Sequence, residues 1–314
     1  MKILIFGDNG WIGNLFYQFI NSLLSTINIV RSELRIIPSN YDKIVNVIKN
    51  NYVSHVFVAV GTIRDNNRSN TSVLHDTNAR IDNNKTIDYI EDKLELNIQN
   101  NMTVQMIMCN IADKLKVHTT IIGTGCIYDD TQHLEQHKNS SHKYTEDDLP
   151  NYSGSKYSLI KSTLNNYIVM TNSKNVLHLR IRMPINNGCD DYDYIAKIIK
   201  YRRVIDVPNS ITVLDDFYPI IFDMMCKYKY GTYNIVNPGI ISPIEILELY
   251  KQIVDDSYTF EKITTSELHE ITIGKRCNVE LSTDKIQQLY RINISDIRTS
   301  IVRVLEQMKH LIKH

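Results

Sequence analysis

The sequence predicts an α/β protein with a doubly wound parallel sheet, and three observations support this. Short apolar runs alternate with longer amphipathic segments through the first 125 residues. The short runs are apolar throughout, as strands must be when both faces of their sheet are covered. A glycine-rich turn also follows the first run directly and opens the first amphipathic segment. Together these features indicate repeated strand–helix–strand units.

The expected strands cover 3–6, 28–30, 55–60, 119–122 and 176–181, and the expected helices cover 11–25, 41–50, 94–114 and 157–170. After Pro184 the alternation changes, with helices expected at 194–201, 245–254 and 297–314 and a strand at 233–236. We therefore expect a Rossmann-type domain over 1–183, with return elements near 212–238, and a smaller α+β domain over 184–314. Polar stretches at 61–87 and 132–150 predict a surface insertion and a loop.

Composition excludes several classes of function. Lys plus Arg and Asp plus Glu each number 35, so a general nucleic-acid binder, which needs clustered cations, is not expected. No long apolar run predicts a membrane span, and the first strand begins too early for a signal sequence. The five cysteines are odd in number and form no CxxC pair, which favours a reduced, cytoplasmic compartment. The histidines near position 135 do not form an HExxH motif, so no metal site is expected.

The glycine-rich turn reads Gly-Asp-Asn-Gly-Trp-Ile-Gly over residues 7–13. Glycines permit a tight turn and a close approach of the backbone to a pyrophosphate, and free N–H groups at the helix start hold the anion. This context predicts dinucleotide binding. The expected contacts are Gly7, Asn9, Gly10, Trp11, Ile12 and Gly13. The GxxGxxG spacing resembles that of the extended short-chain dehydrogenase/reductases.

The end of the second strand predicts which dinucleotide binds. An acidic residue there favours NAD, whereas an arginine accommodates the 2′-phosphate of NADP. The strand ends in Val-Arg-Ser, so Arg31, together with Arg35, favours NADPH. A solvated surface arginine is the alternative, and Glu33 would then serve the ribose of NADH. Further cofactor contacts are expected from Ala59, Gly61 and Asn97.

Reduction of a ketone needs a proton donor beside the nicotinamide. A tyrosine serves when a lysine four residues later on the same helix face stabilises its phenolate. Four such pairs occur: Tyr89/Lys93, Tyr152/Lys156, Tyr157/Lys161 and Tyr258/Lys262. We predict Tyr157 and Lys161, because they lie in the first clear helix after the 119–122 strand. These two residues would also contact the cofactor. Thr124, at the carboxyl end of that strand, is the expected partner hydroxyl, with a structural turn as the alternative.

Several segments together resemble one enzyme family. They are Gly-Trp-Ile-Gly at 10–13, Thr-Gly-Cys-Ile-Tyr at 124–128, Tyr-Ser-Gly-Ser-Lys-Tyr-Ser at 152–158, Leu-Arg-Ile-Arg-Met-Pro-Ile at 179–185, Val-Pro-Asn-Ser-Ile-Thr-Val-Leu-Asp-Asp at 207–216, Tyr-Asn-Ile-Val-Asn-Pro-Gly at 233–239 and Ile-Leu-Glu-Leu-Tyr at 246–250. In this order they resemble the 3,5-epimerase/4-reductases of UDP-L-rhamnose synthesis, found in plants and giant viruses. The resemblance runs nearly end to end and departs from the family at the Asn-rich stretch 61–87.

The resemblance implies a reaction and further site residues. The family converts UDP-4-keto-6-deoxy-D-glucose to UDP-L-rhamnose by inverting C3 and C5 and reducing C4 with NADPH. It implies that Cys126 and Lys197 exchange the protons at C3 and C5, and that Asn209 and Arg276 hold the UDP moiety. Without the resemblance, Cys126 would read as a small buried apolar residue and the others as surface polar groups.

We therefore predict a cytoplasmic bifunctional epimerase/reductase, located in the host cytoplasm if the gene is viral. Its partner is a UDP-linked keto-deoxy sugar, and the chain is compatible with a homodimer. A reductase or epimerase of a dTDP- or GDP-linked 4-keto sugar is the alternative enzyme. A catalytically silent NADP-binding scaffold of the same fold is the alternative from another class.

Overall fold

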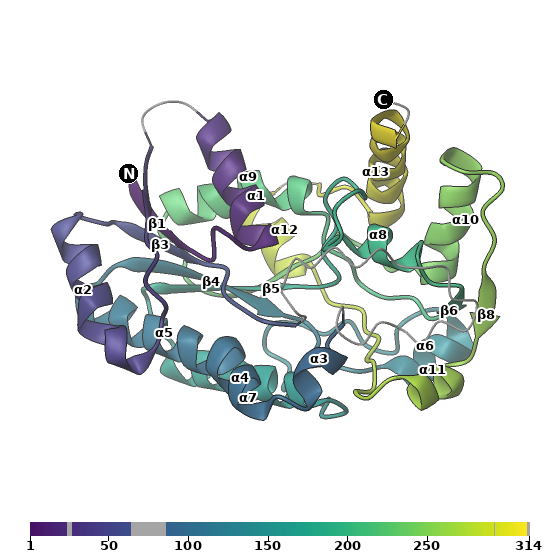
Figure 1. The fold of residues 1–314 in the computed structure, drawn as a ribbon, viewed down its shortest axis with the longest axis horizontal. Helices are drawn as coiled ribbons and strands as arrows, with labels where there is room; N and C mark the ends of the chain where they lie inside the picture. Colours follow the sequence, from purple (N-terminus) through teal and green to yellow (C-terminus); the bar gives the residue numbers. More distant parts are fainter. Residues whose placement is uncertain (24–26, 64–85, 292, 313–314) are drawn as a thin grey trace.

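The computed structural model describes residues 1–23, 27–63, 86–291 and 293–312. Most of the predicted 61–87 insertion, 64–85, lies outside these ranges, as do positions 24–25 and 313–314 at the ends of two predicted helices. Two sheets organise the chain (Figure 1). The larger contains β1 (Lys2–Phe6), β2 (Asn28–Arg31), β3 (His55–Val58), β4 (His118–Thr124), β5 (Val176–Ile181) and β7 (Gly231–Ile235). The smaller contains β6 (Arg203–Ile205) and β8 (Glu261–Ile263).

The larger sheet runs in the order β2-β1-β3-β4-β5-β7, and every neighbouring pair is parallel. The predicted fold class, a doubly wound parallel sheet with a smaller α+β part, is confirmed. The strand order reverses direction between β1 and β3, and α/β sheets bind ligands beyond the carboxyl ends of the strands at such a point. A ligand site is therefore expected at that edge of the sheet.

The helices are α1 (Trp11–Ser22), α2 (Tyr41–Asn50), α3 (Asp88–Glu91), α4 (Leu94–Ile98), α5 (Val104–Leu115), α6 (Thr131–His137), α7 (Lys156–Thr171), α8 (Tyr194–Ile198), α9 (Leu214–Cys226), α10 (Pro243–Ile253), α11 (Thr265–Ile271), α12 (Asp284–Tyr290) and α13 (Ile297–Ile312). A short 3₁₀ turn covers Pro38–Asn40, and a π-helical turn covers Gln99–Thr103. Among the described residues, no helix is long and apolar enough to cross a membrane.

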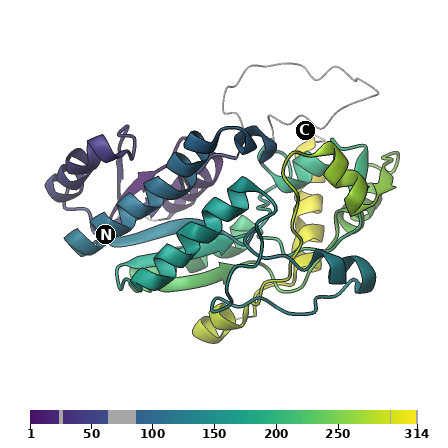
Figure 2. The same cartoon turned by 90° about the horizontal axis from the view of Figure 1, so that it is seen from below.

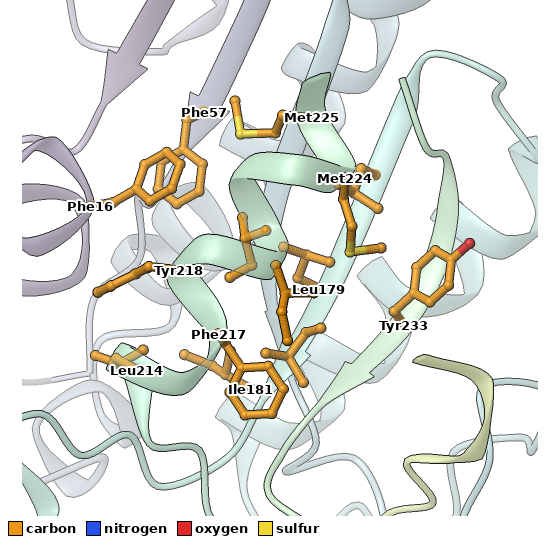
Figure 3. Packing of buried hydrophobic residues seen from close by; sticks show 14 of the residues in the cluster. Phe16, Phe57, Leu179, Ile181, Leu214, Phe217, Tyr218, Met224, Met225 and Tyr233 are labelled. Atoms are coloured by element: carbon orange, nitrogen blue, oxygen red, sulfur yellow. The ribbon is translucent and has the colours of Figure 1, made fainter. Parts of the chain in front are cut away.

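Alternation along the strands builds a core on each face of the sheet. In β1, Ile3 and Ile5 join the core formed with α1, α9 and α12, which includes the stacked rings of Phe16 and Phe57 with centroids 3.9 Å apart (Figure 3). Leu4 and Phe6 join the opposite core, formed with α2, α5 and α7 (Figure 2). Burying both faces explains the continuous apolar run of β1 and the apolar majority of β3.

A third core lies beside the sheet and packs α8, β6, α10 and α13 together. We call α8, β6, α10, β8, α11 and α13 the C-terminal lobe. Its apolar contacts include Ile195 of α8, Leu247 of α10 and Ile301 of α13. In sequence between parts of this lobe, α9 and β7 return to the larger sheet, where β7 pairs with β5.

Two predicted elements differ from the structure. The helix expected over 94–114 is α4 and α5 joined by the π turn. The loop expected over 132–150 begins instead with α6, which is anchored by the fully buried Leu134 against Ile205 and Ile263 of the smaller sheet. A single apolar anchor gives no helical periodicity, so the sequence pattern did not reveal α6.

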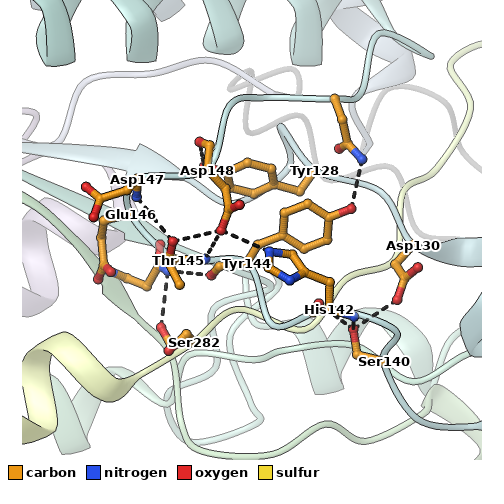
Figure 4. A network of polar contacts seen from close by, with 12 residues as sticks. Tyr128, Asp130, Ser140, His142, Tyr144, Thr145, Glu146, Asp147, Asp148 and Ser282 are labelled. Carbon is orange, nitrogen blue, oxygen red and sulfur yellow. Dashed lines mark hydrogen bonds and ion pairs between the residues drawn. The ribbon is translucent and has the colours of Figure 1, made fainter.

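The rest of that loop folds onto the larger sheet through a polar network (Figure 4). The Asp148 carboxylate accepts the backbone N–H of Thr145 at 2.7 Å and lies 3.0 Å from the His142 ring. The rings of Tyr128 and Tyr144 stack 4.7 Å apart. The buried guanidinium of Arg180 donates to the carbonyl oxygens of residues 145 and 146. These bonds fix the chain that leads into α7.

Candidate active site

The glycine-rich turn lies at the carboxyl end of β1, beside the end of β3. Gly7 has φ +89°, and a Cβ there would lie 2.6 Å from the carbonyl oxygen of Ala59. A Cβ at Gly13 would lie 2.2 Å from the carbonyl oxygen of Gly7. Only glycine fits either position, because the obstacle is backbone in both cases.

The start of α1 is open to an anion. Gly10 is its N-cap and provides no side-chain hydrogen bond, and both Asn9 and Gly10 are exposed. The first N–H groups of the helix and its dipole therefore face the space above the turn, as pyrophosphate binding requires. Ile12 packs against the sheet core, which fixes the helix direction. The residues present fit a dinucleotide.

Trp11 connects this turn to the chain that leads into α8. Its ring stacks on that of Tyr192 with centroids 6.3 Å apart, and its indole N–H has no hydrogen-bond partner among the described residues. Asp193 then accepts N–H groups from Asn186 and Ile195, which caps α8. The expected cofactor turn and the C-terminal lobe are therefore in contact.

Arg31 lies at the end of β2, where the sequence placed it, but its guanidinium is already paired. It forms an ion pair with Asp8 and lies 3.4 Å from the side-chain oxygen of Asn9. Its charge also lies 5.3 Å from the centre of the Tyr17 ring. The hydrogen bond with Asp8, followed by the charge of Asp8, raises the pKa of Arg31. Arg35 is exposed, and its carbonyl oxygen accepts hydrogen bonds from Asn40 and from the N–H of Ile37.

The segment after β3 is held by amide side chains. Asn101 donates to the carbonyl oxygen of Thr62 at 2.8 Å and to the side chain of Asn97 at 2.9 Å. Its own side-chain oxygen would lie 3.2 Å from a Cβ at Gly61. The buried side-chain nitrogen of Asn97 has no partner among the described residues. A buried donor with no partner among the described residues, linked to Gly61 through Asn101, is consistent with a ligand contact.

Tyr157 and Lys161 lie on the buried face of α7, 8% and 6% exposed. The side chain of Thr124 lies near enough to the Tyr157 phenol to act on its pKa, so the end of β4 and the start of α7 lie close together. Burial and the neighbouring charge of Cys126 raise the pKa of Tyr157, which keeps the phenol protonated at neutral pH. Burial lowers the pKa of Lys161 to about 8, against the opposing charge of Cys126.

The other tyrosine–lysine pairs have different surroundings. Tyr152 lies in the loop before α7, whose first residue is Lys156. Lys93 follows α3 and its ammonium lies 3.3 Å from the centre of the Tyr89 ring. Tyr258 donates to a carbonyl oxygen at the end of α8, while Lys262 is in β8. Only Tyr157 and Lys161 share one buried helix face at the end of β4.

Cys126 lies two residues beyond Thr124, half-buried, and is surrounded by groups that stabilise negative charge. Arg182 places one guanidinium nitrogen 2.6 Å from its sulfur, and the same nitrogen is 3.2 Å from the sulfur of Cys277. The neighbouring Cys277 side chain and the charge of Arg182 lower the pKa of Cys126, although its burial acts in the opposite direction. Thr124, Cys126 and Tyr157 therefore form one cluster.

Lys197 lies half-buried in α8, one turn beyond Tyr194. The charge of Arg182 acts on the pKa of Tyr194, although burial of that phenol outweighs it and raises the pKa. Residues three apart share a helix face, so Lys197 lies on the same side of α8 as Tyr194. Its contact with a sugar stays a prediction.

The two residues expected at the UDP moiety have protein partners here. The side-chain oxygen of Asn209 accepts two hydrogen bonds from Arg182, at 3.0 and 2.9 Å. The Arg276 guanidinium donates to both carboxylate oxygens of the buried Asp88, at 3.1 and 2.8 Å. Burial would raise the pKa of Asp88, but the hydrogen bonds and charge of Arg276 leave it lowered. The predicted roles of Asn209 and Arg276 stay predictions.

Three residues of this region were not predicted: Arg182, Cys277 and Glu91. Glu91 accepts the backbone N–H groups at the start of α7, from Lys156 at 2.8 Å and Tyr157 at 3.1 Å. The sequence does contain a signal for Arg182, because Arg180 and Arg182 flank a single residue at the end of an otherwise mostly apolar strand. Guanidinium groups in such a place need buried partners. Nothing in the local sequence distinguishes Cys277 or Glu91.

The fold and this cluster define an extended short-chain dehydrogenase/reductase. L780 of Acanthamoeba polyphaga mimivirus is 32% identical over 312 residues, 98% of this chain and 99% of L780. The crystal structure of L780, described as a UDP-rhamnose synthase, superposes with a TM-score of 0.85 at 31% identity over 98% of this chain and 99% of that one. The chain belongs to the L780 family, and the resemblance found in the sequence is confirmed.

Two further relatives are informative. The bifunctional dTDP-4-dehydrorhamnose 3,5-epimerase/dTDP-4-dehydrorhamnose reductase of Arabidopsis thaliana is 29% identical, over 96% of this chain and 91% of that protein. The dTDP-4-dehydrorhamnose reductase of Bacillus anthracis, crystallised with NADP, shares the fold with a TM-score of 0.72 at 14% identity over 100% of this chain and 98% of that one. No protein-family model matches the chain.

Proposed function

We propose that this protein converts UDP-4-keto-6-deoxy-D-glucose to UDP-L-rhamnose by epimerisation at C3 and C5 and reduction at C4. Membership of the L780 family is one support. The single structural observation that carries the proposal is the meeting of Thr124, Cys126 and Tyr157 at the carboxyl end of β4. A reductase alone needs the hydroxyl and the phenol but has no use for an activated sulfur.

The two chemistries share one carbonyl. The C4 ketone acidifies the protons on C3 and C5, so removing either proton places negative charge on the C4 oxygen. Hydride addition at C4 places charge on the same oxygen. Thr124 and Tyr157 donate hydrogen bonds to that oxygen in both steps, since electrostatic stabilisation is needed wherever the charge develops.

Proton transfer is divided among three side chains. Cys126 and Lys197 exchange protons on the two faces of C3 and C5, which inverts each centre. Tyr157 then gives its proton to the C4 oxygen during reduction, because its raised pKa keeps that proton in place until it is needed. Lys161, buried one turn further along α7, stabilises the phenolate that remains.

NADPH, when bound, supplies the hydride. Gly7, Gly10 and Gly13 hold its pyrophosphate at the start of α1, with Asn9, Trp11, Ile12, Ala59, Gly61 and Asn97 beside it. Arg31 favours NADPH over NADH by binding the 2′-phosphate, for which it exchanges part of its pairing with Asp8. The preference rests on Arg31, because proteins of this fold are found with NADP and with NAD.

The two parts of the chain divide the binding of cofactor and substrate between them. Residues 1–183, with the returning α9 and β7, hold the cofactor, and residues 184–314 mainly hold the sugar nucleotide. Asn209 and Arg276 contact the UDP moiety once substrate displaces part of their present pairing. The five free cysteines suit a reducing cytoplasm.

The test is a direct product assay. The protein is incubated with NADPH and UDP-, dTDP- or GDP-linked 4-keto-6-deoxy sugar, with absorbance at 340 nm and NMR of the product as readouts. The proposal requires cofactor oxidation with the UDP sugar and a product of L-rhamno configuration. A D-configured product would identify a simple reductase, and cofactor binding without turnover would identify a scaffold.

A further inference from the structure

Arg182 carries a charge that the described protein does not neutralise with a carboxylate. Its side chain is 1% exposed, and no described Asp or Glu forms an ion pair with it. Two of its hydrogen bonds go to the side-chain oxygen of Asn209 and one to the carbonyl oxygen of Cys277, all neutral acceptors. A buried cation without a counter-charge is strongly unfavourable.

The remaining guanidinium nitrogen faces sulfur. It lies 2.6 Å from the sulfur of Cys126 and 3.2 Å from that of Cys277. The neighbouring Arg180 is a useful contrast, since its buried guanidinium faces Asn165 and the carbonyl oxygens of residues 145 and 146 instead. Two buried arginines of one chain segment therefore have different environments, and only Arg182 contacts thiols.

We propose that Arg182 is the counter-ion of a resting Cys126 thiolate, and that the Cys277 thiol donates a hydrogen bond to the same sulfur. Both are positioning residues for the proton transfer at C3 and C5, so this inference rests on the proposed function for its role. The thiolate supplies the negative charge that Arg182 otherwise lacks. Charge pairing with arginine is a known means of lowering a thiol pKa.

The two sulfurs have unequal roles. Cys126 is half-buried and follows Thr124, so it faces the cluster that would hold the sugar, whereas Cys277 is 6% exposed. The interaction between the two sulfurs lowers the pKa of Cys126 and raises that of Cys277. In this proposal the thiolate is therefore Cys126, which lies nearer the shared Arg182 nitrogen, and the proton is on Cys277. Cys126 begins the cycle able to accept a proton from carbon, leaving the electron pair on the C4 oxygen.

The test uses iodoacetamide alkylation of the substrate-free protein, with mass spectrometry to assign each cysteine and pH varied from 5 to 9. Cys189 and Cys226 are the internal references, because both are exposed to the reagent. Their thiols are also protonated at pH 6, since partial burial and a nearby aspartate raise the pKa of each. At pH 6, Cys126 should react about tenfold faster than these references, since the higher thiolate fraction outweighs its weaker nucleophilicity. Equal rates, or slower reaction of Cys126, would overturn the proposal.

Three variants refine the test. Arg182→Lys should raise the pH midpoint of Cys126 alkylation by about one unit, because an ammonium cannot reach the sulfur and Asn209 together. Cys277→Ala should shift the midpoint in the same direction, and Cys277→Ser, which retains a donor, should restore part of the shift. Arg180→Lys is the matched control and should leave the midpoint unchanged; an equal shift there would contradict a specific ion pair.

Solvent deuterium entry at C3 and C5 supplies the link to catalysis. If Cys126 is a thiolate in alkylation but no sugar exchanges deuterium, the proposed function fails and the ion pair stands. If deuterium exchanges, but the exchange rate falls at the same acidic pH in wild type and in Cys277→Ala, the positioning role of Cys277 fails. Should Arg182→Lys not fold, the Cys277 variants alone decide between these outcomes.

Discussion

The carboxylate of Glu91 accepts a hydrogen bond from the backbone N–H of Tyr157 at 3.1 Å. Its second oxygen accepts the N–H of Lys156 at 2.8 Å, so a residue 66 positions away in the chain caps the helix that carries the proposed proton donor. Glu91→Ala leaves these N–H groups unpaired. We expect a loss of about 1–2 kcal/mol in the free energy of unfolding, typical of a lost N-cap with a favourable helix-dipole interaction.

We expect the same variant to slow reduction at C4 several-fold, because the position of Tyr157 depends on this cap. Urea unfolding and steady-state NADPH oxidation measure the two effects. Glu91→Gln keeps one acceptor oxygen and should recover part of both. Exposed Glu95, on α4, gives the matched control as Glu95→Ala. If Glu91→Ala and Glu95→Ala behave alike, the cap does not position Tyr157.

Tyr157→Phe should separate the two chemistries. Removing the phenol proton is expected to lower NADPH oxidation at least about 100-fold, the usual contribution of a general acid. Deuterium entry at C3 and C5 should fall less than about tenfold, since Thr124 still donates to the C4 oxygen. Tyr89→Phe, from a tyrosine–lysine pair outside the cluster, is the control and should be neutral. Parallel loss of both activities in Tyr157→Phe would refute the division of roles.

Arg31 and Asp8 give a prediction about cofactor choice. Arg31→Ala should lower kcat/KM for NADPH about tenfold and leave that for NADH nearly unchanged, because only NADPH carries the 2′-phosphate. Asp8→Asn should act in the opposite direction by releasing the guanidinium from its ion pair. Arg35→Ala tests whether the exposed neighbour contributes. Equal losses with both cofactors in Arg31→Ala would mean that Arg31 does not read the phosphate.

His55 predicts a loss of stability in acid. Burial, assisted by the charge of His118, lowers the pKa of His55 from 6.5 to about 4. Its ring lies 3.0 Å from the carbonyl oxygen of Met225 and is 2% exposed. Below pH 6.5 the His55 imidazole binds a proton in the unfolded chain but not in the folded chain. The free energy of unfolding therefore falls as the pH falls toward 4.

The expected contribution of His55 between pH 6.5 and 4 is on the order of 2 kcal/mol. Unfolding followed in urea at several pH values measures it. His55→Gln should flatten the pH dependence, and the matched change at exposed His137 should not. An unchanged slope in His55→Gln would show that other groups, such as the buried His118, dominate.

Much of the fold could be predicted because local patterns and burial agree. The strand predicted at 176–181 is β5 residue for residue, and the helix predicted at 157–170 is α7 extended by one residue at each end. The helix α9 was not predicted, since Pro219 lies inside it and lacks the N–H that continues a helix. Proline there costs about 3 kcal/mol. Burying Phe217, Ile221 and Met224 outweighs this, at about 1.5–3 kcal/mol each.

The site could be predicted only where its residues are adjacent in sequence or follow a strand. Thr124 ends β4, and Tyr157 and Lys161 are one turn apart, so position and spacing indicated these three, whereas Cys126 was indicated only by the family resemblance. Cys277 reaches Arg182 across 95 positions, and Glu91 reaches Tyr157 across 66. Contacts between residues so far apart in sequence depend on how α3 and the chain before α12 pack. A local sequence pattern does not predict that packing.

Arg182 extends from the last residues of the larger sheet to Asn209 and Cys277, both of which come from the later part of the chain. Its guanidinium therefore links the larger sheet to the later part of the chain, as well as lying beside the Cys126 sulfur. Any movement that drew the later part of the chain away would separate Arg182 from Asn209 and Cys277, whereas Cys126 and Arg182 follow two paired strands and would stay together. Cross-links that restrict such a movement should therefore affect stereochemical inversion through Cys277 and hydride delivery through the distance between sugar and cofactor.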